Sequence, residues 1–135
     1  MASITLDEAL AAINAAVRKA RELNAPVGIS VVDDRGDVIA SVQMDGVRFG
    51  FLPDISRGKA FATVIWGGQP SGALAERAGN PVFSWVQDYY HGKAVYAKGA
   101  VPVKRGDKLI GAVGAGGSSQ ENDEAIAQAG ADAIR

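Results

Sequence analysis

Apolar residues recur at every third or fourth position over the first part of the chain, which is the spacing of one face of a helix. The pattern begins after Thr5, and the hydroxyl of Thr5 with the carboxylate of Glu8 forms a capping-box sequence. Pro26 ends the pattern, because the residue before a proline is disfavoured in a helix. We therefore predict a helix over residues 6–24.

Shorter segments that are β-branched or apolar at alternate positions predict strands. They fall in two pairs, and each pair is joined by a turn that contains a glycine, Gly36 or Gly106. Two β-hairpins are therefore expected, with strands at residues 27–32, 37–43, 94–103 and 108–113. Residues 47–52 fit either a further short strand or a loop.

The remaining helical patterns fall at residues 55–66, 71–78, 81–90 and 121–134. No linker, tandem repeat or low-complexity block interrupts this order. The alternation of helices with strand pairs predicts an α+β fold, with an antiparallel sheet and helices packed against it. The length of 135 residues suits a single domain over residues 1–135.

Composition excludes several classes of function. The 14 basic and 15 acidic residues balance and are spread along the chain, so no basic face for nucleic acid is expected. Without cysteine there is no disulfide, thiolate metal site or cysteine nucleophile. No apolar run reaches the roughly 18 residues that span a membrane, and the N-terminus lacks the pattern of a signal peptide. We expect a cytoplasmic protein.

The glycine-rich segment 98–119 is the most informative stretch. Gly114 and Gly116 precede a helix, as in dinucleotide-binding loops, but Ser119 stands where the next glycine is required. Two interpretations remain open: a strand that passes close to another backbone, or exposed amides that hold a carboxylate. The candidate ligand-binding residues of this segment are Lys98, Gly99, Val101, Gly116, Gly117 and Ser118.

His91 is the only histidine, so acid–base chemistry by an imidazole must use it. No second histidine is available to complete a typical transition-metal site, and no metal site is expected apart from haem. His91 follows Trp85, Tyr89 and Tyr90, which suit either a subunit contact or a planar ligand. We include all four as candidates, with His91 as a catalytic residue.

Basic residues in the middle of the chain are candidate clamps for a carboxylate. Arg48 has the fork geometry for this, and Arg57 and Lys59 lie early in the second helix after Asp54. On a surface helix such charges are usually solvated. Lys59 lies between two small residues, so its stem could be buried. Lys59 is a candidate catalytic residue, and Arg48, Asp54 and Arg57 are candidate ligand-binding residues.

Several short motifs occur in an order that is similar to a known family. They are Val31-Val32-Asp33 with Gly36, Met44-Asp45-Gly46, Gly58-Lys59-Ala60, Gly99-x-Val101-Pro102-Val103, Ile110-Gly111-Ala112-Val113-Gly114 with Gly117, and Asp123-Glu124-x-Ile126-Ala127-x-Ala129-Gly130. The chain resembles the GlcG/HbpS-like haem-degrading family, also found at the C-terminus of PduO-type corrinoid adenosyltransferases. The resemblance implies a profilin-like sandwich, self-association from dimers to octamers, and haem or corrinoid binding.

The sequence departs from the family pattern at sites that bear on the ligand. Gly99 is followed by Ala100, Gly114 by Ala115, and the aromatic run 83–91 is unusually rich. The first helix has no histidine, so haem ligation from that helix cannot be transferred. If haem is the cofactor, its iron must be held by His91 or by a tyrosinate from Tyr89 or Tyr90, or it must have no side-chain ligand.

Three hypotheses for function follow. The first is a small-molecule-binding oligomer that takes haem or a tetrapyrrole. The second is a cofactor-independent enzyme of the isomerase, lyase or hydratase type, with His91 as acid–base group and a small organic acid as substrate. The third is a structural or regulatory subunit without catalysis.

Overall fold

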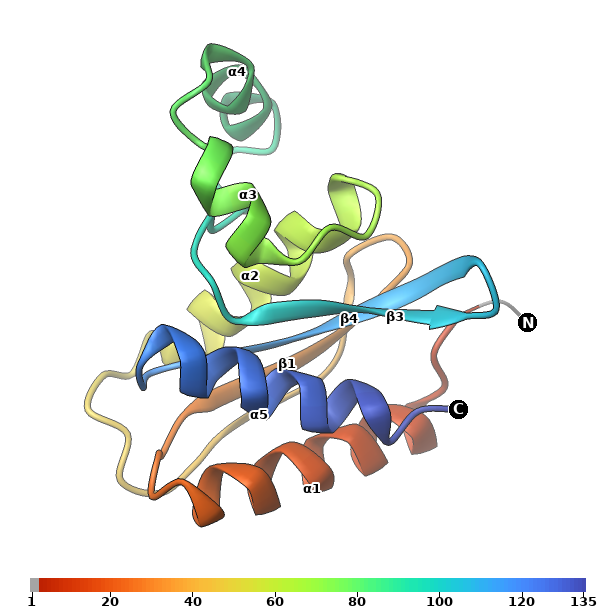
Figure 1. The fold of residues 1–135 in the computed structure, drawn as a ribbon, viewed down its shortest axis with the longest axis vertical. Coiled ribbons are helices and arrows are strands. Elements are labelled where there is room, and N and C mark those ends of the chain that lie inside the picture. Colours follow the sequence, from red (N-terminus) through yellow and green to blue (C-terminus); the bar gives the residue numbers. More distant parts are fainter. Residues whose placement is uncertain (1–2) are drawn as a thin grey trace.

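The computed structural model describes residues 3–135, and these form five helices and four strands (Figure 1). In chain order they are α1 (Leu6–Glu22), β1 (Gly28–Asp33), β2 (Val38–Gln43), α2 (Leu52–Ile65), α3 (Ser71–Arg77), α4 (Pro81–Tyr89), β3 (Ala100–Arg105), β4 (Lys108–Gly116) and α5 (Gln120–Asp132).

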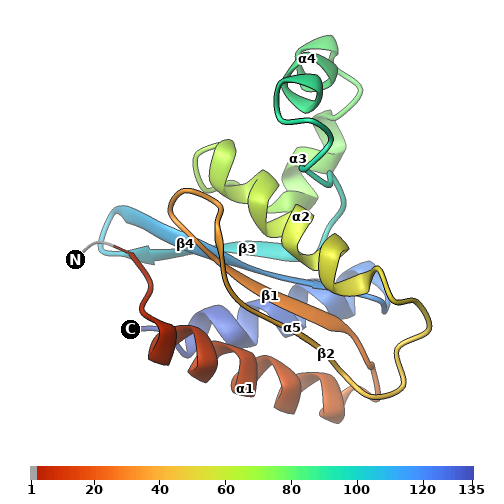
Figure 2. The ribbon, with the colours of Figure 1, turned by 180° about the vertical axis from the view of Figure 1, so that it is seen from behind.

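The strands form one antiparallel sheet in the order β2-β1-β4-β3. Helices α1 and α5 lie side by side on one face, and α2 crosses the other face (Figures 1 and 2). The predicted α+β fold with an antiparallel sheet flanked by helices is confirmed. β1 and β4 occupy the centre, so β2 and β3 are the two edge strands.

The central strand β1 is buried on both faces, which explains its continuous apolar sequence. Ile29 and Val31 face α1 and α5 in the larger core cluster, and Val32 faces α2 in a smaller one. β2 is only half covered, and its exposed and partly buried positions alternate over most of its length. One face of β2 is therefore left largely uncovered.

Helix α2 comes unusually close to the sheet because glycines lie beneath it. A Cβ on Gly114 of β4 would be 2.2 Å from the carbonyl oxygen of Ser56. A Cβ on Gly28 of β1 would be 2.5 Å from the nitrogen of Pro53. The first of the two interpretations of the glycine-rich segment is therefore confirmed at Gly114, where the strand passes close to the backbone of α2.

Helices α3 and α4 form an arm that projects away from the sheet (Figures 1 and 2). Its base is held by aromatic packing, with the rings of Trp66 and Phe83 stacked at 4.2 Å between centroids. The hydroxyl of Tyr96 accepts a hydrogen bond from Trp66 Nε1 at 3.0 Å. The arm therefore has its own small core beside that of the sheet.

Two predicted boundaries are wrong and one open choice is resolved. The strand expected at residue 94 begins only at Ala100, because the preceding segment packs on α2 and Val95 donates its N–H to the Gly58 carbonyl. The following strand continues to Gly116 rather than Val113, paired with Gly28. Residues 47–51 form a loop. Among residues 3–135, no helix is long and apolar enough to cross a membrane.

The N-terminus of α1 is fixed by the capping box that the sequence predicts. Thr5 Oγ1 accepts the Glu8 N–H at 3.1 Å, and Glu8 Oε1 accepts the Thr5 N–H at 2.9 Å. The other carboxylate oxygen of Glu8 contacts the guanidinium of Arg105 in β3. The Thr5 N–H, followed by the charge of Arg105, holds the pKa of Glu8 below its ordinary value.

The lowered pKa predicts a pH-dependent contribution to stability. A carboxyl group with a lowered pKa in the folded state stabilises the fold above its unfolded pKa, and this contribution is lost as the pH falls through the folded value. Glu8→Gln keeps the cap but loses the charge, so we expect a loss of up to about 1 kcal/mol at pH 7 that shrinks below about pH 4. Urea denaturation of the wild type and of Glu8→Gln at pH 7 and at pH 3 measures this difference in the free energy of unfolding.

The matched control is Glu22→Gln at the other end of α1, where the ion pair with Lys19 is exposed and 3.8 Å long. This variant should unfold like the wild type at both pH values. A Glu8→Gln effect of equal size at pH 7 and pH 3 would contradict the role assigned to the charge.

Candidate functional site

A cleft lies between α1 and the open edge of the sheet. It has a volume of about 680 Å³, within the range of small-molecule sites. Its walls come from the second half of α1, the turn that follows and the end of β2. The lining residues are Ile13, Asn14, Val17, Ala20, Arg21, Asn24, Ala25, Pro26, Val42, Gln43, Met44 and Asp45.

The local sequence explains the shape of this cleft. Asn24 takes a left-handed conformation, with φ of 52°, and lets the chain leave α1 and enter β1. α1 is thereby set under β1 and β2, with apolar Ile13 and Val17 on the cleft wall. Because β2 is an edge strand, no further strand covers the cleft on that side.

The chemistry of the cleft is mixed. Ile13, Val17 and Val42 give apolar walls, and the half-buried Met44 adds a thioether. Arg21 supplies a guanidinium that can pair with a carboxylate. The cleft can therefore hold an apolar ligand that carries an acidic group.

The predicted residue Lys59 lies inside the fold, not on a surface. It is 5% exposed, and its ammonium donates to Asp123 Oδ2 at 3.2 Å and to the carbonyl oxygen of Ala115 at 3.0 Å. Asp123 is 3% exposed, and its other oxygen accepts the N–H of Ser118 at 2.9 Å. The buried pair thus joins α2, β4 and the first turn of α5.

Glycines make room for this ammonium. A Cβ on Gly99 would lie 2.7 Å from Lys59 Nζ, and one on Gly116 would lie 3.6 Å from it. Gly99 has a φ of 142°, which disfavours any other residue there. Both candidate glycines therefore surround a lysine that the protein itself neutralises. The ammonium is engaged internally instead of facing a ligand, and the catalytic role assigned to Lys59 stays a prediction.

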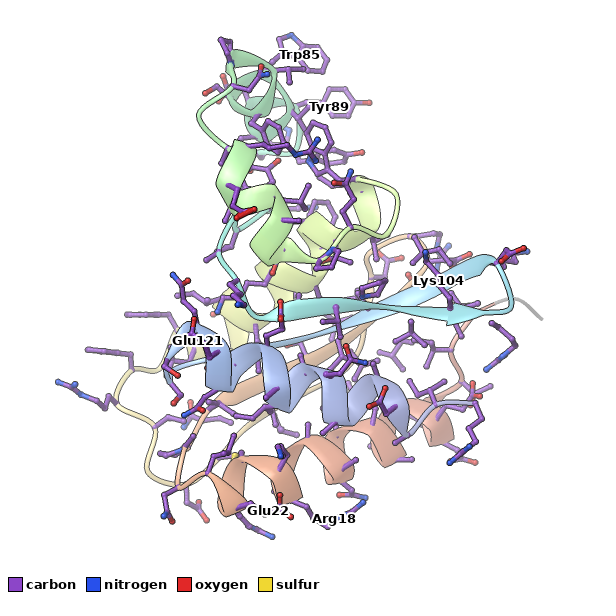
Figure 3. All side chains as sticks on the ribbon, in the orientation of Figure 1. Arg18, Glu22, Trp85, Tyr89, Lys104 and Glu121 are labelled. Carbon is purple, nitrogen blue, oxygen red and sulfur yellow. The ribbon has the colours of Figure 1, made fainter. Side chains whose placement is uncertain are left out.

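The other candidates in the glycine-rich segment lie around this pair. Val101 is buried in the core on the α1 and α5 side of the sheet. A Cβ on Gly117 would lie 2.8 Å from a methyl group of Leu52, and the Ser118 hydroxyl accepts from Asn122. Lys98 lies 3.9 Å from Glu121, which marks the start of α5 in Figure 3.

Lys98 also lines a groove of about 550 Å³ between α3 and α5. The other charged residues of that groove are Glu76 and Glu124. Two carboxylates against one ammonium disfavour the binding of an organic anion. The groove thus gives little support to the carboxylate site that the sequence suggested there.

The candidates around His91 lie on the arm. His91 is exposed, directly after α4, with a φ of 57°. Trp85 and Tyr89 are 65% and 62% exposed, stack on each other at 5.5 Å and project from the outer end of the arm (Figure 3). Tyr90 instead packs edge-on against Phe61 of α2. Two of the three aromatic side chains therefore face outward.

The remaining candidates are on the surface. Arg48 lies over the exposed ring of Phe49 at 5.4 Å. Arg57 and Asp54 face each other across one turn of α2 at 3.8 Å, both well exposed. The predicted residues therefore gather in three places: the buried lysine, the arm and the exposed start of α2.

Two residues of the sites described above are missing from the sequence-based set. Asp123 is the partner of Lys59, and the only signal for it is its place in the closing Asp-Glu motif of the family resemblance. Met44 lines the cleft between α1 and β2, and the signal for it is its place in the Met44-Asp45-Gly46 motif of the family resemblance. Among the described residues, no group of three or more His, Cys, Asp or Glu side chains could hold a metal ion.

The buried pair predicts a large and specific effect on stability. Lys59→Met leaves Asp123 charged and unpartnered inside the fold, so we expect a loss of about 3–5 kcal/mol in the free energy of unfolding. The double variant Lys59→Met with Asp123→Leu removes both charges and should recover most of that loss. Urea denaturation of the three proteins measures this coupling.

Lys98→Met is the matched control, because the ion pair of Lys98 with Glu121 is exposed and long. It should change the unfolding free energy by less than about 1 kcal/mol. A double variant no more stable than Lys59→Met would show that the pair does more than neutralise charge.

Comparison with known proteins places these features in a family. The model of the family described as haem degrading protein HbpS-like matches residues 4–132. An uncharacterized 15.0 kDa protein from the dhaT-dhaS intergenic region of Citrobacter freundii is 34% identical over 133 residues. This match covers 98% of the chain and 92% of that protein.

Solved structures agree. A double mutant of Streptomyces reticuli HbpS matches with a TM-score of 0.88 and 28% identity, covering 100% of this chain and 89% of that one. Klebsiella pneumoniae ORFY matches with a TM-score of 0.87 and 30% identity, and the match covers 98% of this chain and 91% of that one. A structure of a PduOC:heme complex matches with a TM-score of 0.85 and 26% identity, and the match covers 98% of this chain and 96% of that one. The chain belongs to the HbpS-like family of haem-degrading proteins, as its sequence motifs predicted.

Proposed function

We propose that this protein binds haem or a related tetrapyrrole in the cleft between α1 and β2. The observation that carries the proposal is the size and mixed lining of this cleft, about 680 Å³, in which aliphatic side chains and one thioether stand beside the polar residues Asn14, Arg21, Asn24, Gln43 and Asp45. The family adds support, since it is described as haem-degrading and one similar structure is a haem complex.

The residues of the cleft fit the chemistry of haem. The macrocycle is flat and apolar, and Ile13, Val17 and Val42 offer aliphatic surface for it. Haem also carries two carboxylates, and the cleft offers the guanidinium of Arg21 for one of them, opposed by the single carboxylate of Asp45. The sulfur of Met44 is of a ligand type that holds haem iron in other proteins.

Each of these residues has a separate part in the proposal. Met44 would hold the iron, Arg21 would hold a propionate, and Ile13 with Val17 would exclude water from one face. Bound haem would supply an iron centre whose reduction potential depends on its axial ligand and its burial.

The arm is a less suitable place for the same ligand. Its cavity, lined by Phe83, Gln87 and Tyr96 among others, measures about 200 Å³ and does not include His91. Trp85 and Tyr89 stand on the outer surface, where they cannot enclose a macrocycle within one chain. The proposal therefore departs from the ligation by His91, Tyr89 or Tyr90 considered from the sequence.

A hemin titration tests the proposal. The wild type should give a saturable, shifted Soret band. Val17→Trp fills the cleft and should weaken hemin binding at least roughly tenfold. Met44→Leu keeps the apolar volume but lacks the sulfur, so it should move the Soret maximum while leaving the thermal stability of the apoprotein nearly unchanged.

His91→Ala is the decisive control, because it removes the only imidazole without touching the cleft. It should bind hemin like the wild type. Loss of the Soret band in His91→Ala, with unchanged binding by Val17→Trp, would overturn the cleft and favour the arm. A spectrum that does not saturate would reject haem binding at either place.

A further inference from the structure

The lining of the cleft matches only part of the charge of haem. Haem carries two carboxylates, whereas the lining offers the guanidinium of Arg21 and the opposing carboxylate of Asp45. These two protein charges cancel, and the lining contains no second cation for the other carboxylate of haem. A further cation at the rim of the cleft would supply that partner.

Arg48 lies in the loop that leaves this rim. The loop between β2 and α2 starts at Met44 and Asp45 of the cleft, next to the C-terminal end of α1 in both ribbon views (Figures 1 and 2). A Cβ on Gly46 would lie 3.7 Å from Cβ of Pro26, which is part of the cleft wall. Because Arg48 follows shortly after Asp45 in the chain, their Cα atoms are at most about 11 Å apart. The long side chain of Arg48 is thus within reach of the rim.

The guanidinium of Arg48 is held by an aromatic stack and not by a carboxylate. Its Cζ atom lies 5.4 Å from the ring centre of Phe49, and Phe51 stacks on Phe49 with ring centres 5.1 Å apart and planes at 6°. None of the ion pairs formed within residues 3–135 includes Arg48. A guanidinium on an aromatic face keeps its N–H donors, which lie in its own plane. The stack therefore presents a positioned donor group.

Both rings of the stack are exposed to water. Phe49 is 48% exposed and Phe51 is 52% exposed, although the next residue, Leu52, is buried and anchors the loop. Contact of two adjacent aromatic rings with water is unfavourable. Support of the Arg48 guanidinium gives these rings a role at this position.

Other cations of the neighbouring elements are less well placed for a ligand in the cleft. Lys19 and Arg57 each face a carboxylate one turn away on their own helix. Arg18 lies on the side of α1 that faces away from the sheet (Figure 3). Arg48 instead combines a place near the rim with a guanidinium that no carboxylate of the described residues engages.

We infer that Arg48 is a second carboxylate clamp of the tetrapyrrole site and that Phe49 is its positioning residue. The inference rests on the proposed function, since the carboxylate belongs to haem bound in the cleft. Arg21 pairs with one propionate from the cleft wall, and Arg48 pairs with the other from the loop. The site thereby selects tetrapyrroles with two ionised carboxylates over their neutral esters.

A comparison of hemin with its dimethyl ester tests the clamp. The wild type should bind hemin at least roughly tenfold more tightly than the ester. Arg48→Gln should weaken hemin binding roughly five- to tenfold and leave ester binding within about twofold, because only hemin carries the ionised groups. Arg48→Lys keeps the charge without the fork and should fall between the wild type and Arg48→Gln.

Arg57→Gln is the matched control, since this exposed arginine lies on α2 and does not line the cleft. It should bind both ligands like the wild type. Arg48 and Phe49 are exposed, so their variants should keep the thermal stability of the apoprotein.

A double-mutant cycle tests the role of Phe49. Phe49→Leu removes the ring and should weaken hemin binding about threefold, whereas Phe49→Tyr keeps the ring and should bind hemin like the wild type. In the Arg48→Gln background, Phe49→Leu should cause no further loss of hemin affinity. A role of Phe49 that is independent of Arg48 would instead make the two losses add.

Three results would overturn the inference: unchanged hemin binding by Arg48→Gln, an equal loss of affinity for hemin and its ester, or an equal loss in Arg57→Gln. Val17→Trp, which fills the cleft, separates the clamp from the proposed function. Hemin binding that is weakened in Val17→Trp and unchanged in Arg48→Gln would keep the cleft and reject the clamp. A wild type without saturable hemin binding would reject both.

Discussion

The ion pair between Lys59 and Asp123 is the contact on which the arrangement of the structure depends. It ties α2, on one face of the sheet, to α5, on the other, through the end of β4. Such a pair stabilises only when both charges are held by further polar contacts, because each has lost its water. The carbonyl of Ala115 and the N–H of Ser118 provide those contacts. The glycines around the ammonium follow from the same requirement for space.

This contact explains why the glycine-rich segment does not form a nucleotide loop. The N–H of Ala115 donates to the carbonyl of Gly99 within the sheet, the N–H of Ser118 donates to Asp123, and the ammonium of Lys59 is used by the buried pair. The cleft lies elsewhere, between α1 and β2, where the sheet has an open edge. The buried ion pair of Lys59 with Asp123 and the cleft thus involve different residues of the fold. A binding site in the cleft can vary without disturbing the buried pair.

The side chains that could hold haem iron in this chain differ from those that the family resemblance suggests. The absence of histidine in the first helix removes one source of an iron ligand, yet Met44 brings a different ligand type to the wall beside that helix. The arm carries the only imidazole and a stacked aromatic pair, but it encloses little volume. Under the haem proposal, a different iron ligand on the fold of the family would account for both observations. The same fold can carry different sites, so the scaffold alone does not decide the chemistry.

The sequence by itself determined the local elements, because capping residues, apolar spacing and turn residues act over a few positions. Thr5 with Glu8, the two hairpins and the final helix could all be predicted in this way, and the ordered motifs gave the family. The start of β3 could not, since Val95 is held by a hydrogen bond to a distant helix. Nor could the pairing of Lys59 with Asp123 or the cleft at Met44, whose parts are far apart in the chain. Burial and the joining of distant segments exist only in the tertiary structure, and they decide whether a lysine faces a ligand or its own protein.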